Sequence, residues 1–167
     1  MSTFSTKNLK TLREQYPNID KETLKSHLIS KQDDVEQANK SVAKYVSWKL
    51  ANYPILKSSI INELNTGKLY VRGVDREGNP LLIFCSRYNF PKERDLEQSV
   101  KMCAWMVQHA LNRPPGKKYT LLLDRTNHST QNTDLEFMKR NRETNSVSFF
   151  SIGRFNFFFT DYFFSHW

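Results

Sequence analysis

The hydrophobic pattern of this chain changes its period at Lys68, and this change limits the fold more than any other feature. Upstream, apolar residues recur at helical spacing, so residues 1–66 are predicted to form helices joined by short polar turns. Downstream, residues 69–74 and 80–85 predict two strands, and the turn at 75–78 between them ends in glycine. The short turn predicts that these strands pair antiparallel.

Polar residues, proline and glycine divide the helical part. The segment Asp33-Asp34-Val35-Glu36 resembles a capping box and predicts a helix that runs to about Asn52. Pro54 stops that helix and opens a further short one, which continues through Leu64 and ends at Gly67.

After the two strands, Pro91 is predicted to open a long helix over residues 92–111. Residues 119–124 form a continuous apolar run between turn signals, which is typical of a strand buried on both faces. A capping box at residues 133–136 predicts one more helix. Helices before and after such a strand indicate an α/β layer fold with a mixed sheet flanked by helices.

Composition and charge limit the partners and the cellular location that this chain can be expected to have. The chain has 167 residues, the size of one ordinary domain, and a formal net charge of +8, which favours contact with anionic surfaces. Because no run of like charges reaches five, we expect no nucleic-acid partner. Residues 1–10 lack the apolar core of a secretory signal, and Cys85 and Cys103 are expected to be free buried thiols, so a cytoplasmic location is predicted.

An ordered set of motifs resembles the CRAL-TRIO lipid-binding superfamily, which includes phosphatidylinositol-transfer and tocopherol-transfer proteins. The hairpin reads Tyr-x-x-Gly-x-Asp-x-x-Gly-x-Pro from Tyr70 to Pro80, a strand then ends in Asp at Asp124, and a Leu-Glu-Phe-Met-Lys segment follows at 135–139. The helical lead-in is also similar to the small N-terminal region of that family. The resemblance covers about residues 25–140.

The resemblance implies a function without covalent chemistry. An apolar cavity would shield a hydrophobic ligand, a phosphoinositide or another lipid, from water, and burial at roughly 25 cal/mol per Å² would supply the affinity. The cationic surface would assist peripheral docking on anionic membranes. The expected wall of the cavity is aliphatic and aromatic: Phe84, Tyr88, Trp105, Leu121, Leu123 and Phe137.

The order of segments suggests three regions. Residues 1–66 form the helical N-terminal region, 67–143 the first part of the lipid-binding domain, and 144–167 a tail outside the family pattern that contains eight of the twelve Phe in its last 20 residues. In the family the chain continues through further strands and a gating helix. We therefore expect a truncated or alternatively spliced product, or a mistaken gene model, with impaired lipid binding.

The sequence does not indicate an enzyme, a cofactor or a metal site. Asp124 stands at a strand end, where α/β enzymes place catalytic carboxylates, but no nucleophile, base or phosphate loop accompanies it, so it is expected to cap the turn that follows. The four histidines share no ligand spacing. One alternative stays open: Tyr16-Pro17 followed by Asp34-Val35-Glu36-x-Ala38 suggests a three-helix interaction module that binds ubiquitin.

Overall fold

The computed structural model describes residues 4–112 and 119–144 and begins with three helices, α1 (Thr6–Gln15), α2 (Lys21–Ser30) and α3 (Val35–Asn52). Each helix starts after a polar residue whose side chain accepts a hydrogen bond from the first turn. The predicted helix up to Asn52 is confirmed, but the predicted capping pair is wrong by one residue. Asp34 accepts from the Gln37 amide at 3.0 Å, while Asp33 accepts from the Ser5 amide.

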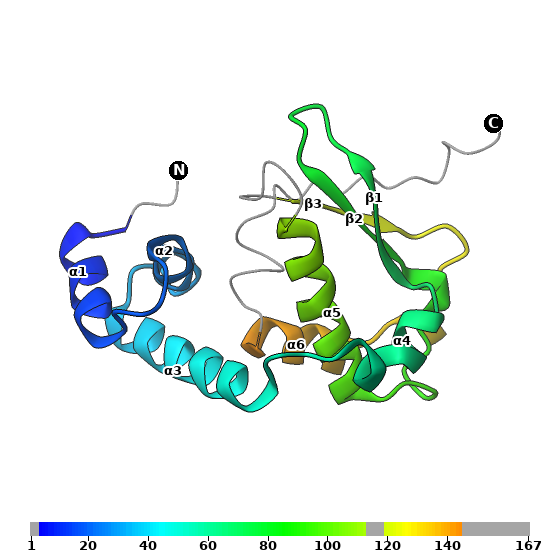
Figure 1. The fold of residues 1–167 in the computed structure, drawn as a ribbon, viewed down its shortest axis with the longest axis horizontal. Helices are drawn as coiled ribbons and strands as arrows, with labels where there is room; N and C mark the ends of the chain where they lie inside the picture. Colours follow the sequence, from blue (N-terminus) through cyan, green and yellow to red (C-terminus); the bar gives the residue numbers. More distant parts are fainter. Residues whose placement is uncertain (1–3, 113–118, 145–167) are drawn as a thin grey trace.

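The three N-terminal helices pack around an apolar cluster of their own. Its fully buried members are Leu9, Leu12, Leu24, Leu28, Ala38 and Val42. The last turns of α3 extend away from this bundle toward α6 (Figure 1), and Trp48 packs against a second apolar cluster. Helix α3 therefore belongs to both cores and connects them.

A three-stranded sheet forms the second half of the described chain. The 3-10 turn η1 (Lys57–Ile60) and the short helix α4 (Ile61–Asn65) lead into β1 (Leu69–Val74), β2 (Pro80–Cys85) and β3 (Thr120–Asp124). The strand order is β1-β2-β3, with β1 and β2 antiparallel, as predicted, and β2 and β3 parallel. The fold is thus a mixed α/β structure, in agreement with the sequence prediction.

The hairpin between β1 and β2 is held by Asp75 and Gly78. Gly78 has a φ of +83°, a conformation that glycine adopts without a steric penalty. One carboxylate oxygen of Asp75 accepts hydrogen bonds from the Glu77 and Asn79 amides at 2.9 and 2.8 Å. The other accepts from the Thr120 hydroxyl at 2.6 Å, which ties the turn to β3.

Helix α5 (Leu96–Leu111) makes the crossover from β2 to β3, after the 3-10 turn η2 (Ser86–Tyr88). The predicted start of this helix near residue 92 is wrong, because Asp95 caps it and accepts from the Gln98 amide at 3.0 Å. The preceding turn instead places Arg94 next to Asp134, at the start of the last helix.

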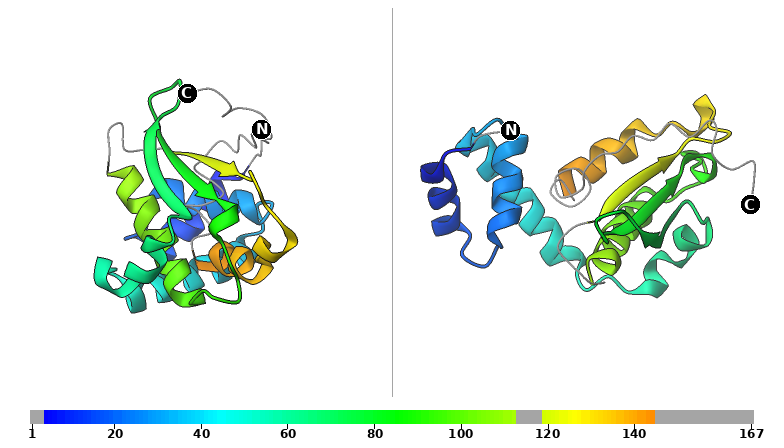
Figure 2. Two further views of the ribbon diagram at one scale, coloured as in Figure 1. Left: turned by 90° about the vertical axis from the view of Figure 1, so that its right-hand side faces the viewer. Right: turned by 90° about the horizontal axis from the view of Figure 1, so that it is seen from above.

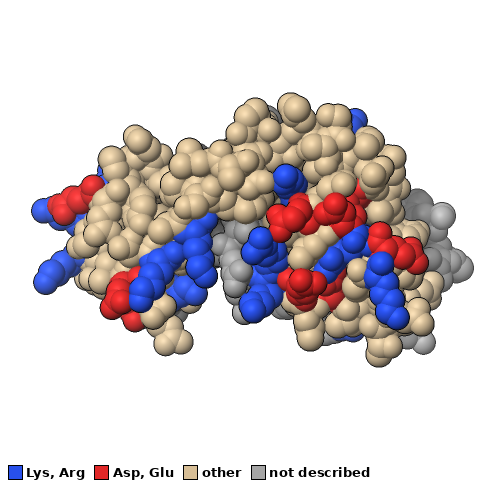
Figure 3. All heavy atoms as spheres, turned by 90° about the horizontal axis from the view of Figure 1, so that it is seen from below, with Lys and Arg blue, Asp and Glu red and all other residues tan. Residues whose placement is uncertain are grey.

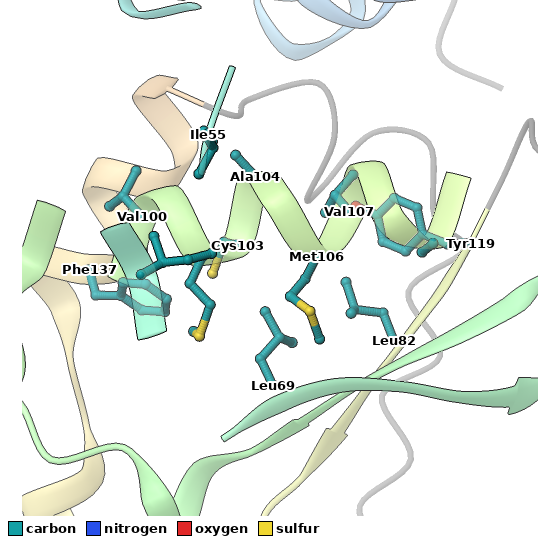
Figure 4. Close-up of a cluster of buried hydrophobic side chains, with 13 residues drawn as sticks. Ile55, Leu69, Leu82, Val100, Cys103, Ala104, Met106, Val107, Tyr119 and Phe137 are labelled. Atoms are coloured by element: carbon teal, nitrogen blue, oxygen red, sulfur yellow. The ribbon is translucent and has the colours of Figure 1, made fainter. Parts of the chain in front are cut away.

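The last helix, α6 (Leu135–Thr144), follows the 3-10 turn η3 (Thr130–Asn132) and lies on the same side of the sheet as α5. Asp134 caps it by accepting from the Phe137 amide at 2.9 Å, one residue later than the predicted capping box. Phe137 reaches into the core beneath α5 (Figure 4).

Only one face of the sheet is covered by described helices. We call it the covered face; by the alternation along the paired strands it carries Leu69, Val71, Leu82, Phe84, Leu121 and Leu123. Figure 4 shows Leu69 and Leu82 on the side of α5 from which Met106 and Cys103 project. This contact forms the main core.

The opposite face, here called the open face, carries Tyr70, Leu81, Ile83 and Leu122. In the left view of Figure 2 no described helix crosses in front of the three strands. Four of the five β3 residues are only half-buried. The prediction that this strand is buried on both faces is therefore wrong for the described part of the chain.

Candidate functional site

An apolar row crosses the open face from one strand to the next. Tyr70 on β1 lies opposite Ile83 on β2, and Ile83 lies opposite Leu122 on β3, so the register puts the three residues on one side of the sheet. Tyr70 also packs against the main core, which Ile83 and Leu122 do not. Leu81 adds to the row farther along β2. All four are half-buried.

Polar groups close the row at the carboxyl ends of β2 and β3. Cys85 lies opposite Asp124 in the parallel pairing, and its thiol lies 3.5 Å from Asp124 Oδ2 and 3.8 Å from the Tyr70 hydroxyl oxygen. Because the carboxyl ends of adjacent parallel strands meet at one edge of a sheet, residues far apart in the sequence come together here.

Arg87, just beyond β2, completes this polar end. Its Nη1 donates to Asp124 Oδ2 at 2.9 Å, and its guanidinium lies 4.8 Å from the centre of the Tyr88 ring. The Arg87 and Asp124 side chains are 30% and 19% exposed, so the pair is within reach of solvent. The Ser86 hydroxyl donates to the Asp124 carbonyl oxygen at 2.9 Å and holds the two strand ends together.

The environment shifts the ionisation of these groups. Burial alone would raise the pKa of Asp124, but hydrogen bonds from Thr126 and Cys85 and the charge of Arg87 outweigh it and lower the pKa. Burial raises the pKa of Cys85 and the pKa of Tyr70. At neutral pH the polar end therefore holds a carboxylate, a guanidinium, a neutral thiol and a neutral phenol.

The structure confirms the expected structural role of Asp124. Its Oδ1 accepts from the Thr126 amide at 2.9 Å, which caps the turn after β3. The two cysteines are free and buried, as expected. His109 is exposed on α5 and stacks on Trp105 with ring centroids 5.3 Å apart. Within residues 4–112 and 119–144, no group of three His, Cys, Asp or Glu side chains could hold a metal ion.

Four of the six residues predicted to line a lipid cavity pack against the main core. Phe84 and Phe137 stack with centroids 6.1 Å apart, Phe137 is 5% exposed, and Leu121 and Trp105 pack against the same cluster. In the structure, these four contact other side chains. A role for them in ligand contact stays a prediction.

The remaining two predicted residues lie elsewhere. Tyr88 is 45% exposed and lies under Arg87, at the polar end of the open face. Leu123 is half-buried, and its place in the strand directs it to the covered side. The structure therefore does not bring the six residues together around one space.

The sequence did not single out the row of the open face as a site. Residues 81–84 are all apolar, so period-two alternation could not show which side chains face the helix. The usable signal was the register: once Leu82 is assigned to the core, Leu81 and Ile83 must point the other way.

The N-terminal helices do form a three-helix bundle with its own core, as the open alternative requires. Tyr16 is fixed to α3, where its hydroxyl contacts Asn39 Oδ1 at 2.5 Å. The role of this bundle in protein interaction stays a prediction. No described helix combines the length and the apolar character that crossing a membrane requires.

Comparison with known families agrees with the motifs and with the fold. The model of the CRAL/TRIO domain matches residues 64–150, slightly more than half of the chain. The match begins at α4 and includes the whole sheet, α5 and α6, and it runs past residue 140, where the resemblance in sequence ended. The chain therefore belongs to the CRAL/TRIO domain family, a family of lipid-binding and lipid-transfer proteins.

Proposed function

We propose that this protein binds a hydrophobic lipid against the open face of its sheet and acts by sequestering or transferring that lipid, without covalent chemistry. The observation that carries the proposal is the half-buried row formed by Tyr70, Ile83 and Leu122, with Leu81 beside it, on a face that no described helix covers. Membership of the CRAL/TRIO family supports a hydrophobic ligand.

The free energy for binding comes from the apolar row. An acyl or isoprenoid chain laid on Leu81, Ile83 and Leu122 would remove apolar surface of both partners from water, at about 25 cal/mol for each Å² buried. The polar end would orient the ligand, because pockets for apolar ligands use a few placed polar groups for that purpose.

We further propose that the protein associates peripherally with anionic membranes. The net charge of +8 supports attraction to such surfaces. On the right-hand part of the face drawn in Figure 3, Lys and Arg side chains are interspersed with Asp and Glu, so the excess charge is not gathered there into one uniform patch. Association should therefore be weak and should fall as salt concentration rises.

The first test is native mass spectrometry of the full chain purified from a eukaryotic host. A compact species with a lipid-sized adduct is expected. Binding of a fluorescent fatty alcohol should then be lost in Ile83→Gln and Leu122→Gln, but kept in Leu50→Gln, which alters an apolar side chain that is 80% exposed on α3. Equal binding by all three variants would reject the open face as the site.

A further inference from the structure

The polar end of the open face contains a matched pair of opposite charges, and this limits the headgroup that it can accept. Arg87 and Asp124 form a direct ion pair at 2.9 Å. The other two groups on this end, the Cys85 thiol and the Tyr70 hydroxyl, are uncharged at neutral pH, since their pKa values are raised by burial. The Arg87–Asp124 pair therefore carries no net charge of its own.

We infer that the lipid bound on the open face has an uncharged polar head, such as a hydroxyl or carbonyl group, and not a phosphate. This inference rests on the proposed function and names the ligand class of the same site. A hydroxyl can donate to Asp124 and accept from Arg87 or Tyr70 without breaking the ion pair. A phosphate at this end would have to lie beside the Asp124 carboxylate, and the two negative charges would repel each other.

The geometry leaves Asp124 little freedom to move away from an incoming anion. Its Oδ1 accepts from the Thr126 amide, and its Oδ2 accepts from Arg87 and the Cys85 thiol. The carboxylate is thus fixed at the carboxyl end of β3 from both sides. Arg87 in turn lies against the Tyr88 ring, which holds the guanidinium over the strand ends.

One other cation lies on the same side of the sheet. Arg72 is two residues beyond Tyr70 on β1 and is exposed, and its charge acts on the Tyr70 hydroxyl. A lipid phosphate held by Arg72 would reverse the orientation of the ligand. The experiment must therefore distinguish the two ends of the row.

The test compares two fluorescent probes that share one polyene chain, a fatty alcohol and its phosphate monoester, in binding titrations with the full chain at neutral pH. The alcohol is expected to bind about tenfold or more tightly than the phosphate, allowing for partial solvent screening of the repulsion. If neither probe binds, the proposed function fails. If the phosphate binds as tightly as the alcohol, only the present inference fails.

Two variants should change the preference for the alcohol over the phosphate in opposite directions. Asp124→Asn keeps an acceptor for the Thr126 amide and leaves Arg87 without its counter-charge, so phosphate binding should rise by about tenfold. Arg87→Gln leaves Asp124 uncompensated, so phosphate binding should weaken further.

Arg76→Gln, which alters an exposed arginine in the hairpin turn, is the matched control and should change neither affinity. If Asp124→Asn does not fold, the comparison of the alcohol with the phosphate on the unmodified chain still tests the inference. If neither Asp124→Asn nor Arg87→Gln changes the affinity for the phosphate probe, the inference is overturned. Such a result would indicate that the phosphate binds near Arg72.

Discussion

Lys68 Nζ lies 2.5 Å from Glu63 Oε2, and the two side chains are only 1% and 5% exposed. The Ser99 hydroxyl donates to Glu63 Oε2 at 2.5 Å, and Lys68 Nζ donates to Asn89 Oδ1 at 3.3 Å. This buried network joins α4, β1, α5 and the loop after β2. It fixes the start of β1 at the point where the chain passes from helices to sheet.

Removing one member of this pair should strongly destabilise the fold. Lys68→Met leaves the Glu63 carboxylate buried without its counter-charge, and breaking a buried pair in this way costs about 3–5 kcal/mol. Urea denaturation of Lys68→Met, Glu63→Leu and the double variant would measure this cost. The double variant should lose much less free energy of unfolding than the two single variants lose together. Additive losses would show that the two residues act independently.

The stability of the protein should fall as the pH falls from 7 toward 5 because of His27. This side chain is fully buried, its Nδ1 lies 2.9 Å from the Ser41 hydroxyl oxygen, and burial, aided by the charge of Lys31, lowers its pKa from 6.5 to about 4. The unfolded chain takes up the proton first, so stability is lost below the unfolded pKa. The expected loss is about 2 kcal/mol at about pH 5.

Denaturation of the wild type and of His27→Gln at several pH values would isolate this effect. Carboxylates that titrate in the same range contribute equally to both proteins. The variant should therefore show the shallower decline between pH 7 and 5. A parallel decline in both proteins would show that His27 does not titrate as described.

Two adjacent residues of β2 should respond very differently to truncation. Leu82 is fully buried against α5, so Leu82→Ala should cost about 2–5 kcal/mol of unfolding free energy. Ile83 is half-buried on the open face, so Ile83→Ala should cost only about 1 kcal/mol. Denaturant midpoints of the two variants would measure the difference. A reversed order would mean that the faces of the sheet are misassigned.

The carboxyl group of Asp75 should report on the tie between the hairpin and β3. The Thr120 hydroxyl is the largest cause that lowers the pKa of Asp75 to about 2, and the Asn79 side chain contributes next. Thr120→Val removes the hydroxyl, so the pKa should rise toward 3.8. Titration of the carboxyl resonance by NMR would measure it. Thr130→Val, which alters an exposed threonine in η3, should leave the pKa unchanged.

Much of the local structure followed from the sequence. The change of period at Lys68 separated helices from strands, Gly78 marked the hairpin turn, and the Asp124 turn was foreseen. These predictions succeed because turns and periodicity depend on residues close together in the chain. The same patterns also led to the CRAL/TRIO family.

Helix starts were less predictable. Proline can open a helix, but at Pro91 the competing cap at Asp95 determined the start, since Arg94 was drawn into an ion pair with Asp134. That pairing connects residues forty positions apart in the chain, and no local pattern contains it. A strong cap near a proline is therefore better evidence for the start of a helix than the proline itself.

The sequence by itself determined the elements, their order and the family. Only the tertiary structure decided which side of each apolar strand faces the helices, because Leu81, Leu82 and Ile83 have the same character and differ only in direction. It also brought Lys68 to Glu63 and Arg87 to Asp124, pairs that form when separate elements pack and the charges must be compensated. For this reason the sequence could not show that four of the six residues of the predicted cavity wall pack against the main core, and their contact with a ligand stays a prediction. The open face followed from the strand register.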